Sequence, residues 1–403
     1  MGKMGRFSIL IIIGVVLQSD HCLMTEQVAE LGSDLGLSVF KYIANSSEIK
    51  NIIISPHGIA TVLGMLQLGA SRKTKSQLIK ALKYNSNGVH QSLKIMRESL
   101  TEKKNRDTVT IANGLFPHKK FSLERPFVTK NKNIFQAEVT SVDYGSSDQA
   151  ASLINKWAMK QTGGMIENLV SSDDLSELTA LVVVNAIFFK GLWKTKFVPE
   201  NTHDEDFYTA DGNVYQVPMM AQRSHFKFGL SVTPNDVRYY VLELPYQGPI
   251  SMFIALPVES DTELWKIMTH INVQTIQNWQ NTLRQRELNL IMPKFTAELE
   301  TDLKEPLSAL GITDMFNSAR ANFPRISASA PIYVSKMFQK AKIEVNEEGT
   351  KAAAATVSII MLKSIGITTP FILNRPFLYF IRHNPTGAIL FAGRVANPEA
   401  ANA

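Results

Sequence analysis

The chain has 403 residues, of which 45% are hydrophobic and 19% charged, and its formal net charge is +6. These values exclude a fibrous or intrinsically disordered protein and allow a large buried core. The mildly positive charge is compatible with an anionic partner but does not require one.

The N-terminus has the pattern of a secretory signal peptide. Lys3 and Arg6 precede an apolar run at residues 7–17, which polar residues follow. The run is too short to span a bilayer as a helix. We therefore expect cleavage after Ser19 or Cys22 and a secreted, extracellular protein without a transmembrane segment.

Cysteine usage and one short motif fit an extracellular chain. Cys22, the only cysteine, lies at the end of the predicted signal peptide. A mature chain without disulfides must depend on its core for stability, which a domain of this size can supply. Asn45-Ser46-Ser47 is an N-glycosylation acceptor, so we predict a glycoprotein modified at Asn45.

Helices are predicted mainly in the first half of the chain. Apolar spacing indicates a helix at about residues 25–45, a short buried strand in "NIIISP", and a buried helix in "HGIATVLGMLQLGA". Further helices are predicted near residues 73–83 and 88–105, and another that ends at Gly163 and Gly164.

Strands dominate the second half. "TALVVVNAIFFKGLW" is a continuous apolar run typical of a strand buried on both faces. Short strands follow in "VRYYVLELPY", "ISMFIALP" and "LNLIMPKF", and the last two strands flank the turn "NPTG". Helices first and strands later favour an α+β fold with large antiparallel sheets. No change in composition marks an internal boundary, so residues 23–403 are predicted to form one domain, with residues 1–19 as the signal peptide.

Motifs of catalytic sites are missing from the sequence. There is no G-x-S-x-G, no H-E-x-x-H, no Walker loop and no G-x-G-x-x-G. The eight histidines are scattered without metal-ligand spacing, so neither a metal nor a cofactor is expected. His57 follows Pro56 and is interpreted as a helix N-terminal residue rather than a base. A triad of distant residues stays open, but no serine has a nucleophile context, so we expect no enzyme.

The stretch "LKIMRESLTEKKNRD" carries a basic cluster with two interpretations. Lys94 and Arg97 are three residues apart and share a helix face, while Lys103, Lys104 and Arg106 gather at its end. Cations near a helix C-terminus interact favourably with the helix dipole, which is the structural interpretation. The functional one is a site for a sulfated glycan, bound through counterion release. Aromatic residues are not interleaved with the basic ones, so nucleic acid is not an expected partner.

Residues 347–370 form an unusually long segment between two predicted strands, "AKIEVN" and "FILNRPF". Connections of this length inside compact domains are usually functional or disordered. Its alanines favour a helix, whereas its small and β-branched residues also suit a strand that slides between existing strands. Lys363, followed by the small Ser364, would then be exposed to a protease with an acidic specificity pocket.

The chain as a whole closely resembles the serpin family, and within it the branch of the nexins and plasminogen activator inhibitors. The resemblance extends from about residue 28 to 398. The matching stretches are "NIIISPHGIATVLGMLQLGA", "INKWAMKQTGGMIENL", "VVNAIFFKGLW", "LKEPLSALGITDMF", "QKAKIEVNEEGTKAAAAT" and "RPFLYFIRHNPTGAILFAGRV".

The resemblance implies a fold of three β-sheets and about nine helices in one domain, with an exposed reactive-centre loop at residues 347–370. It also implies a suicide substrate, in which a protease cleaves the loop, becomes trapped as an acyl-enzyme, and is displaced as the loop inserts into the central sheet. The hinge residues implied by the family are Glu347, Glu348, Gly349, Thr350, Ala352, Ala353, Ala354 and Ala355.

The same resemblance places the reactive bond at Lys363-Ser364 and implies trypsin-like targets such as trypsin, plasmin, thrombin or the plasminogen activators. A shift in register to Leu362 or Met361 would instead imply a chymotrypsin-like target. The rival interpretation is a non-inhibitory serpin that acts as a carrier or chaperone. Small hinge residues favour inhibition, and the expected product is a covalent complex between a monomeric inhibitor and its protease.

Heparin or heparan sulfate is the modulator that the resemblance implies for the basic helix. The nexin branch has a denser lysine array there, and Gln91, Ile95 and Glu98 interrupt it in this chain. Ser55, Asn185 and Trp193 resemble family residues that pack and gate the central sheet. Gln339 stands where many serpins have histidine.

Overall fold

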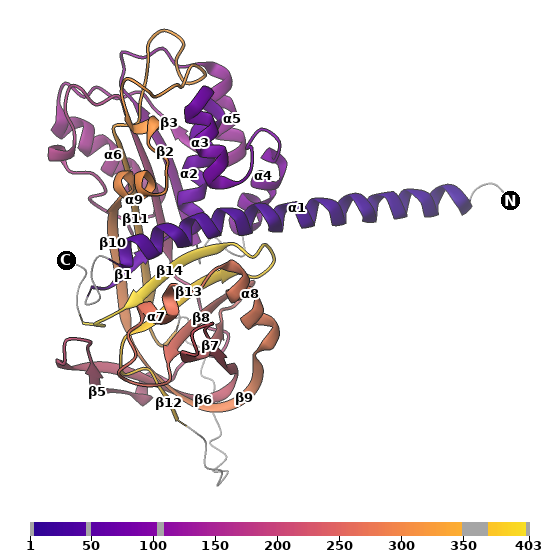
Figure 1. Ribbon diagram of the computed structural model, residues 1–403, viewed down its shortest axis with the longest axis vertical. Coiled ribbons are helices and arrows are strands. Elements are labelled where there is room, and N and C mark those ends of the chain that lie inside the picture. Colours follow the sequence, from indigo (N-terminus) through magenta and orange to yellow (C-terminus); the bar gives the residue numbers. More distant parts are fainter. Residues whose placement is uncertain (1–3, 46–49, 103–108, 349–369, 400–403) are drawn as a thin grey trace.

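The computed structural model describes residues 4–45, 50–102, 109–348 and 370–399 (Figure 1), and it describes side chains from residue 24 onward. Within these ranges the chain forms nine α-helices and two hydrogen-bonded sheets. The helices are α1 (Met4–Ala44), α2 (Pro56–Gly69), α3 (Arg72–Leu82), α4 (His90–Leu100), α5 (Arg125–Phe135), α6 (Ser147–Gln161), α7 (Trp265–Met268), α8 (Val273–Thr282) and α9 (Lys304–Ala309).

Helices α2, α5 and α6 contact a five-stranded sheet. Its strands, in spatial order, are β10 (Phe295–Asp302), β11 (Lys336–Val345), β4 (Leu181–Phe189), β2 (Val109–Pro117) and β3 (Glu138–Val139). β11 and β4 pair in parallel, with residues 336–343 opposite residues 182–189, whereas β10 and β2 pair antiparallel with these two strands. Every residue of β4 is buried, as its continuous apolar run predicts.

The second sheet has nine strands. They are β1 (Ile52–Ile54), β14 (Ile389–Val395), β13 (Phe377–His383), β8 (Ile250–Pro257), β7 (Arg238–Pro245), β6 (Val214–Val232), β9 (Arg284–Pro293) and β12 (Pro370–Ile372), with β5 (Thr202–Tyr208) paired to β6. β6 joins two regions of this sheet, because its first part pairs with β5 and its last part with β7. Two of the three sheets expected from the sequence are therefore continuous through β6.

The helix α2 shows how the sequence positions the core. Ser55 caps its N-terminus by accepting a hydrogen bond from the Gly58 amide at 3.0 Å, and Pro56 occupies the first turn. All of its side chains are buried, as the apolar sequence predicts. Helices α2 to α5 gather at one end of the molecule, and β5, β9 and β12 lie toward the other (Figure 1).

Two predicted helices differ in length from the observed ones. The helix expected at residues 25–45 is the second half of α1, which starts at Met4 because the preceding apolar residues also favour a helix. The helix expected at 88–105 ends at Leu100. Gly163 and Gly164, with φ of 62° and 85°, lie just beyond the end of α6, where left-handed backbone favours glycine. In the described part of the chain, we find no helix with the length and apolar character needed to cross a membrane.

Candidate functional site

The predicted reactive loop connects the two sheets. Glu347 and Glu348 follow β11 of the five-stranded sheet, and Pro370 begins β12 of the nine-stranded sheet. The rest of the predicted hinge and the predicted reactive bond lie outside the described residues. These are Gly349, Thr350, Ala352, Ala353, Ala354, Ala355, Lys363 and Ser364, together with the alternative positions Met361 and Leu362.

Glu347 fixes the start of the hinge through several contacts. Its carboxylate forms an ion pair with Lys294 at 3.2 Å and accepts a hydrogen bond from the Thr202 hydroxyl at 3.0 Å. Its carbonyl accepts a hydrogen bond from the Phe197 amide at 2.9 Å. Burial alone would raise the pKa of Glu347, but hydrogen bonds and the Lys294 ammonium outweigh it and hold this pKa below the usual range. The carboxylate is therefore ionised at neutral pH and holds the hinge to the body of the protein.

Trp193 makes a second set of contacts with the same segment. Its amide donates to the Glu348 carbonyl at 3.2 Å, and its indole Nε1 donates to the Asn346 carbonyl at 2.9 Å. The indole ring stacks on Tyr246, with centroids 4.2 Å apart and planes inclined by 12°. Trp193 thus joins the end of β11 to the nine-stranded sheet through Tyr246, and the gating role that the resemblance implies for it stays a prediction.

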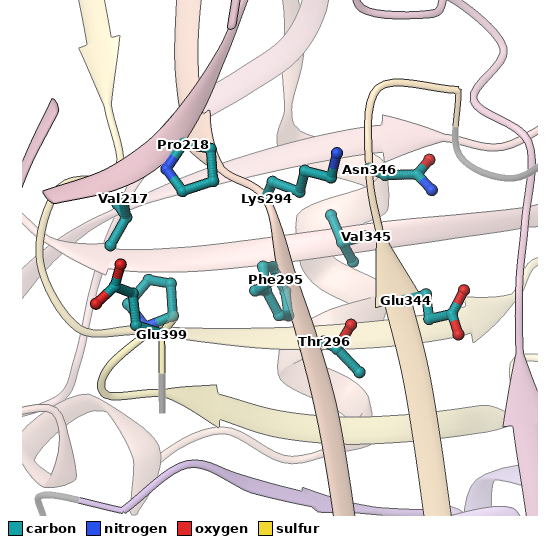
Figure 2. A pocket seen from close by; sticks show the side chains of 10 residues that line it. Val217, Pro218, Lys294, Phe295, Thr296, Glu344, Val345, Asn346 and Glu399 are labelled. Carbon is teal, nitrogen blue, oxygen red and sulfur yellow. The ribbon is translucent and has the colours of Figure 1, made fainter. Parts of the chain in front are cut away.

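A pocket of about 520 Å³ opens beside the hinge (Figure 2). Lys294, just before β10, and Phe295, its first residue, line one side, and Glu344 of β11 and Asn346, just after β11, line the other. Figure 2 shows the Lys294 side chain extending toward Asn346. The ammonium that pairs with Glu347 is therefore also accessible from this pocket, so the hinge contact lies next to open space.

A buried polar network crosses the middle of the five-stranded sheet. Gln339 of β11 donates to Asn185 of β4 at 2.8 Å and to the Ser55 carbonyl at 3.1 Å, while its own amide oxygen accepts from the Ser55 amide at 2.7 Å. Asn185 in turn donates to Asn113 of β2 at 2.8 Å. The network links α2 to three neighbouring strands, and it includes the line where β4 and β11 meet. Ser55 and Asn185 are therefore buried packing groups, and the gating role that the resemblance implies for them stays a prediction.

His57 is the second residue of α2, as predicted. It is buried, and this burial, with a smaller effect of His383, lowers its pKa to about 4. The imidazole is therefore neutral at physiological pH. It lies in the core between α2 and α4 rather than in a catalytic arrangement, since Leu93 and Met96 of α4 line the same small cavity.

Two of the predicted glycan-binding residues lie on α4. Lys94 and Arg97 both approach the Glu98 carboxylate, at 3.9 and 2.8 Å, so they share a face of the helix. The Lys94 side chain is 44% exposed, whereas that of Arg97 is 20% exposed and also donates to the Asn133 carbonyl of α5. Arg97 is therefore held in the structure, and Lys94 is the more accessible cation. Lys103, Lys104 and Arg106 lie outside the described residues.

Three further predictions concern the glycosylation acceptor, the cysteine and metal binding. Asn45 is exposed directly after α1, while Ser46 and Ser47 lie outside the described residues. The side chain of Cys22 is likewise not described. Among the side chains that the structure describes, no three His, Cys, Asp or Glu residues gather in a way that could hold a metal ion.

Sequence reasoning missed Lys294, Thr202 and Asn113. The first two contact Glu347 across long stretches of chain, and Asn113 completes the polar network from a neighbouring strand. Asn113 lies inside β2 and is buried, and an amide in a strand interior is the one local signal that could have indicated a polar partner.

Comparisons with known proteins agree with this geometry. A family model described as Serpin (serine protease inhibitor) matches residues 30–398. Glia-derived nexin from Rattus norvegicus is 50% identical over 397 residues, which cover 98% of this chain and 99% of that protein. Glia-derived nexin from Homo sapiens is 52% identical over 373 residues, covering 92% and 93%.

A more distant relative and a solved structure extend the comparison. Plasminogen activator inhibitor 1 from Neovison vison is 38% identical over 375 residues, covering 92% of this chain and 93% of that protein. The crystal structure of native protease nexin-1 with heparin matches with a TM-score of 0.87 at 50% identity, covering 93% of this chain and all of that one. The chain therefore belongs to the serpin family, has the serpin fold, and is a serine protease inhibitor rather than an enzyme.

Proposed function

We propose that this protein is a secreted suicide-substrate inhibitor of trypsin-like serine proteases, with Lys363-Ser364 as its reactive bond. The protease serine attacks the Lys363 carbonyl, the peptide bond to Ser364 breaks, and the Ser364 amine leaves with a proton from the protease histidine. The product is an ester between the protease and Lys363, and the chain behind it is then free to enter the sheet.

The observation that carries this proposal is the parallel pairing of β11 with β4. A chain that reverses direction after Glu348 runs antiparallel to β11 and, since β4 is parallel to β11, antiparallel to β4 as well. Insertion between them replaces one parallel ladder with two antiparallel ladders. Antiparallel pairing is slightly more stable per residue, and the number of ladders doubles. Small residues at Thr350 and Ala352 would cross the packed interior without steric conflict.

Lys363 supports a trypsin-like target. Its ammonium is complementary to an acidic specificity pocket, and the same reasoning extends to plasmin, thrombin and the plasminogen activators. The named relatives are consistent with this range, because one of them is called plasminogen activator inhibitor 1.

We infer secretion and a glycan modulator from separate features. The N-terminal pattern supports removal of residues 1–19 or 1–22, which N-terminal sequencing of protein from culture medium tests. Lys94, with Lys103, Lys104 and Arg106 beyond it, supports binding of heparin or heparan sulfate, and the similar protease nexin-1 was crystallised with heparin. Heparin binding at about 0.15 M salt that weakens as salt rises is the expected result.

The direct test mixes the purified protein with trypsin, followed by a denaturing gel and mass spectrometry of the released peptide. We expect an SDS-stable band near the summed mass and a peptide that begins at Ser364. Lys363→Ala should slow trypsin inhibition roughly 100-fold, the effect of about 3 kcal/mol in a buried charge contact. Lys351→Ala makes the same chemical change outside the reactive bond and should leave the rate unchanged. Clean cleavage without a stable complex would instead favour the carrier or chaperone role.

A further inference from the structure

A separate pocket of about 550 Å³ lies at the base of the strands β6, β7 and β8, next to the turn at residues 246–248. Three basic side chains line it: Lys194, His225 and Lys227. Glu243 is the one carboxylate in its lining, and side-chain amides complete the polar wall. Nothing in the inhibitory site described above uses these residues' side chains.

The charges of the lining do not cancel. The buried Glu243 carboxylate forms an ion pair with Lys227 at 3.1 Å and accepts a hydrogen bond from the Ser251 hydroxyl at 2.9 Å. Glu243 and Lys227 therefore neutralise each other. Lys194 and His225 are both exposed, and neither side chain has a hydrogen bond or ion pair to the described residues. The pocket thus presents the Lys194 ammonium without a paired carboxylate, while His225 lies opposite Glu287 of β9, whose carboxylate pairs with Arg223.

The walls of the pocket are fixed by hydrogen bonds. The Lys194 amide donates to the Pro245 carbonyl at 3.0 Å, and the Gln247 amide donates to the Leu192 carbonyl at 2.7 Å. Asn384 donates from its side chain to the Ser251 hydroxyl at 3.0 Å. Because the walls are held in place before any ligand arrives, binding requires little further ordering of the protein.

We propose that this pocket binds the sulfate group of a sulfated saccharide, at a site separate from α4. An ammonium, an imidazole and amide N–H groups are donors that a tetrahedral oxyanion accepts. Two other large pockets do not have this excess of basic side chains in their lining. In one of them Asp261 and Glu263 offset the two arginines of the lining, and in the pocket beside the hinge Glu344 and Glu399 outnumber Lys294, so neither lining has an excess of positive charge. The basic lining therefore distinguishes this pocket from these two as a site for sulfate.

The pocket is connected to the hinge through the segment at residues 193–197. Lys194 lies near one end of this segment, next to Trp193, whose amide donates to the Glu348 carbonyl. Phe197 lies at the other end, and its amide donates to the Glu347 carbonyl. A ligand that holds Lys194 stabilises this segment and, through it, the closed hinge. Bound saccharide should therefore slow the inhibition of trypsin. This consequence rests on the proposed function, whereas the binding itself does not.

Isothermal titration calorimetry tests the binding with the full-length secreted protein and a heparin-derived tetrasaccharide. The background variant carries Lys94→Gln, Lys103→Gln and Lys104→Gln, which removes cations from the α4 region. We expect residual binding in this background, weakened about tenfold by Lys194→Gln through loss of one charged hydrogen bond. Lys196→Gln makes the same change in the same segment but outside the pocket, so it should leave binding unchanged.

Three outcomes would overturn the proposal. The first is loss of all tetrasaccharide binding in the background variant. In the second, Lys194→Gln and Lys196→Gln have equal effects. The third is binding of inorganic sulfate, titrated at matched ionic strength, without binding of the tetrasaccharide, which would assign the pocket to a free oxyanion. The trypsin assay separates these failures from that of the proposed function, since a protein that is no inhibitor fails that assay without any saccharide.

Discussion

Different kinds of contact stabilise the interiors of the two sheets. On the nine-stranded sheet, the buried rings of Phe253 and Phe380 pack against Trp279 of α8, with centroids about 6 Å apart. In the five-stranded sheet, amide side chains of Gln339 and Asn185 meet in the interior at the boundary between β11 and β4. Apolar packing has no preferred direction, whereas an amide network is satisfied in one arrangement only.

This difference indicates where the molecule can open. β4 and β11 are parallel, so no hairpin joins them, and the hinge contacts of Glu347 and Trp193 close one end of their boundary. Release of those contacts, followed by exchange of the amide hydrogen bonds, would let a new strand enter. The described central strands of the nine-stranded sheet have no such parallel boundary, because each of β13, β8, β7 and β6 pairs antiparallel with the next.

The largest expected effect is loss of inhibition in Thr350→Arg. A charged side chain cannot enter the interior between β4 and β11 without a large desolvation cost, so the cleaved loop would stay outside the sheet. Trypsin would then turn over the variant as a substrate, which a gel and a titration of residual trypsin activity detect. Thr350→Ser, a small polar replacement, should remain an inhibitor. Full inhibition by Thr350→Arg would contradict insertion at this boundary.

Phe380→Ala should weaken the nine-stranded sheet without changing the mode of inhibition. The deletion leaves a cavity against Trp279 and Phe40 and should lower the free energy of unfolding by about 3–5 kcal/mol. Urea denaturation measures this loss. The fraction of trypsin trapped at low temperature should match that of the unchanged protein, and a shift toward substrate behaviour would show that both sheets take part in opening.

His57 should make stability depend on pH. Its pKa is about 4 in the folded protein and near 6.5 when exposed, so the unfolded chain binds one more proton between these values. The free energy of unfolding should therefore fall by up to about 3 kcal/mol as the pH drops from 6.5 to 4. His57→Gln should remove this slope in urea denaturation series, whereas His90→Gln, an exposed position on α4, should retain it. An unchanged slope in His57→Gln would rule out this origin.

Asn185→Ala should have a smaller effect on stability but a distinct effect on function. It leaves Gln339 and Asn113 without a shared partner, at a cost of about 1–3 kcal/mol. Because the loss lies at the boundary that opens, the ratio of trapped to released trypsin should change, in contrast to Phe380→Ala. Equal ratios for the two variants would remove the functional distinction between the sheets.

The sequence predicted the elements whose burial is continuous. α2 and β4 are apolar at nearly every position, and both are buried throughout. The reactive loop was predicted from its length and small residues, and from the family resemblance. The hinge contacts were not, because Lys294 and Thr202 reach Glu347 from segments distant in the sequence, and no local pattern encodes such pairs.

The continuity of the large sheet through β6 was also missed. Its burial alternates irregularly, since its first part pairs with β5 and β9 and its last part with β7 and β9. A strand that changes its neighbours along its length has no single periodic pattern. The basic pocket beside the turn at residues 246–248 was missed for a similar reason, because its cations come from separate segments.

Hydrogen exchange of backbone amides tests the central claim most directly. The exchange of β4 and β11 is compared with that of β13 and β8, before and after the loop is cleaved by limited proteolysis. If the five-stranded sheet opens between β4 and β11, these strands exchange faster than β13 and β8 in the intact protein and become equally protected after cleavage. Equal protection of all four strands in the intact protein, without change on cleavage, would contradict the account.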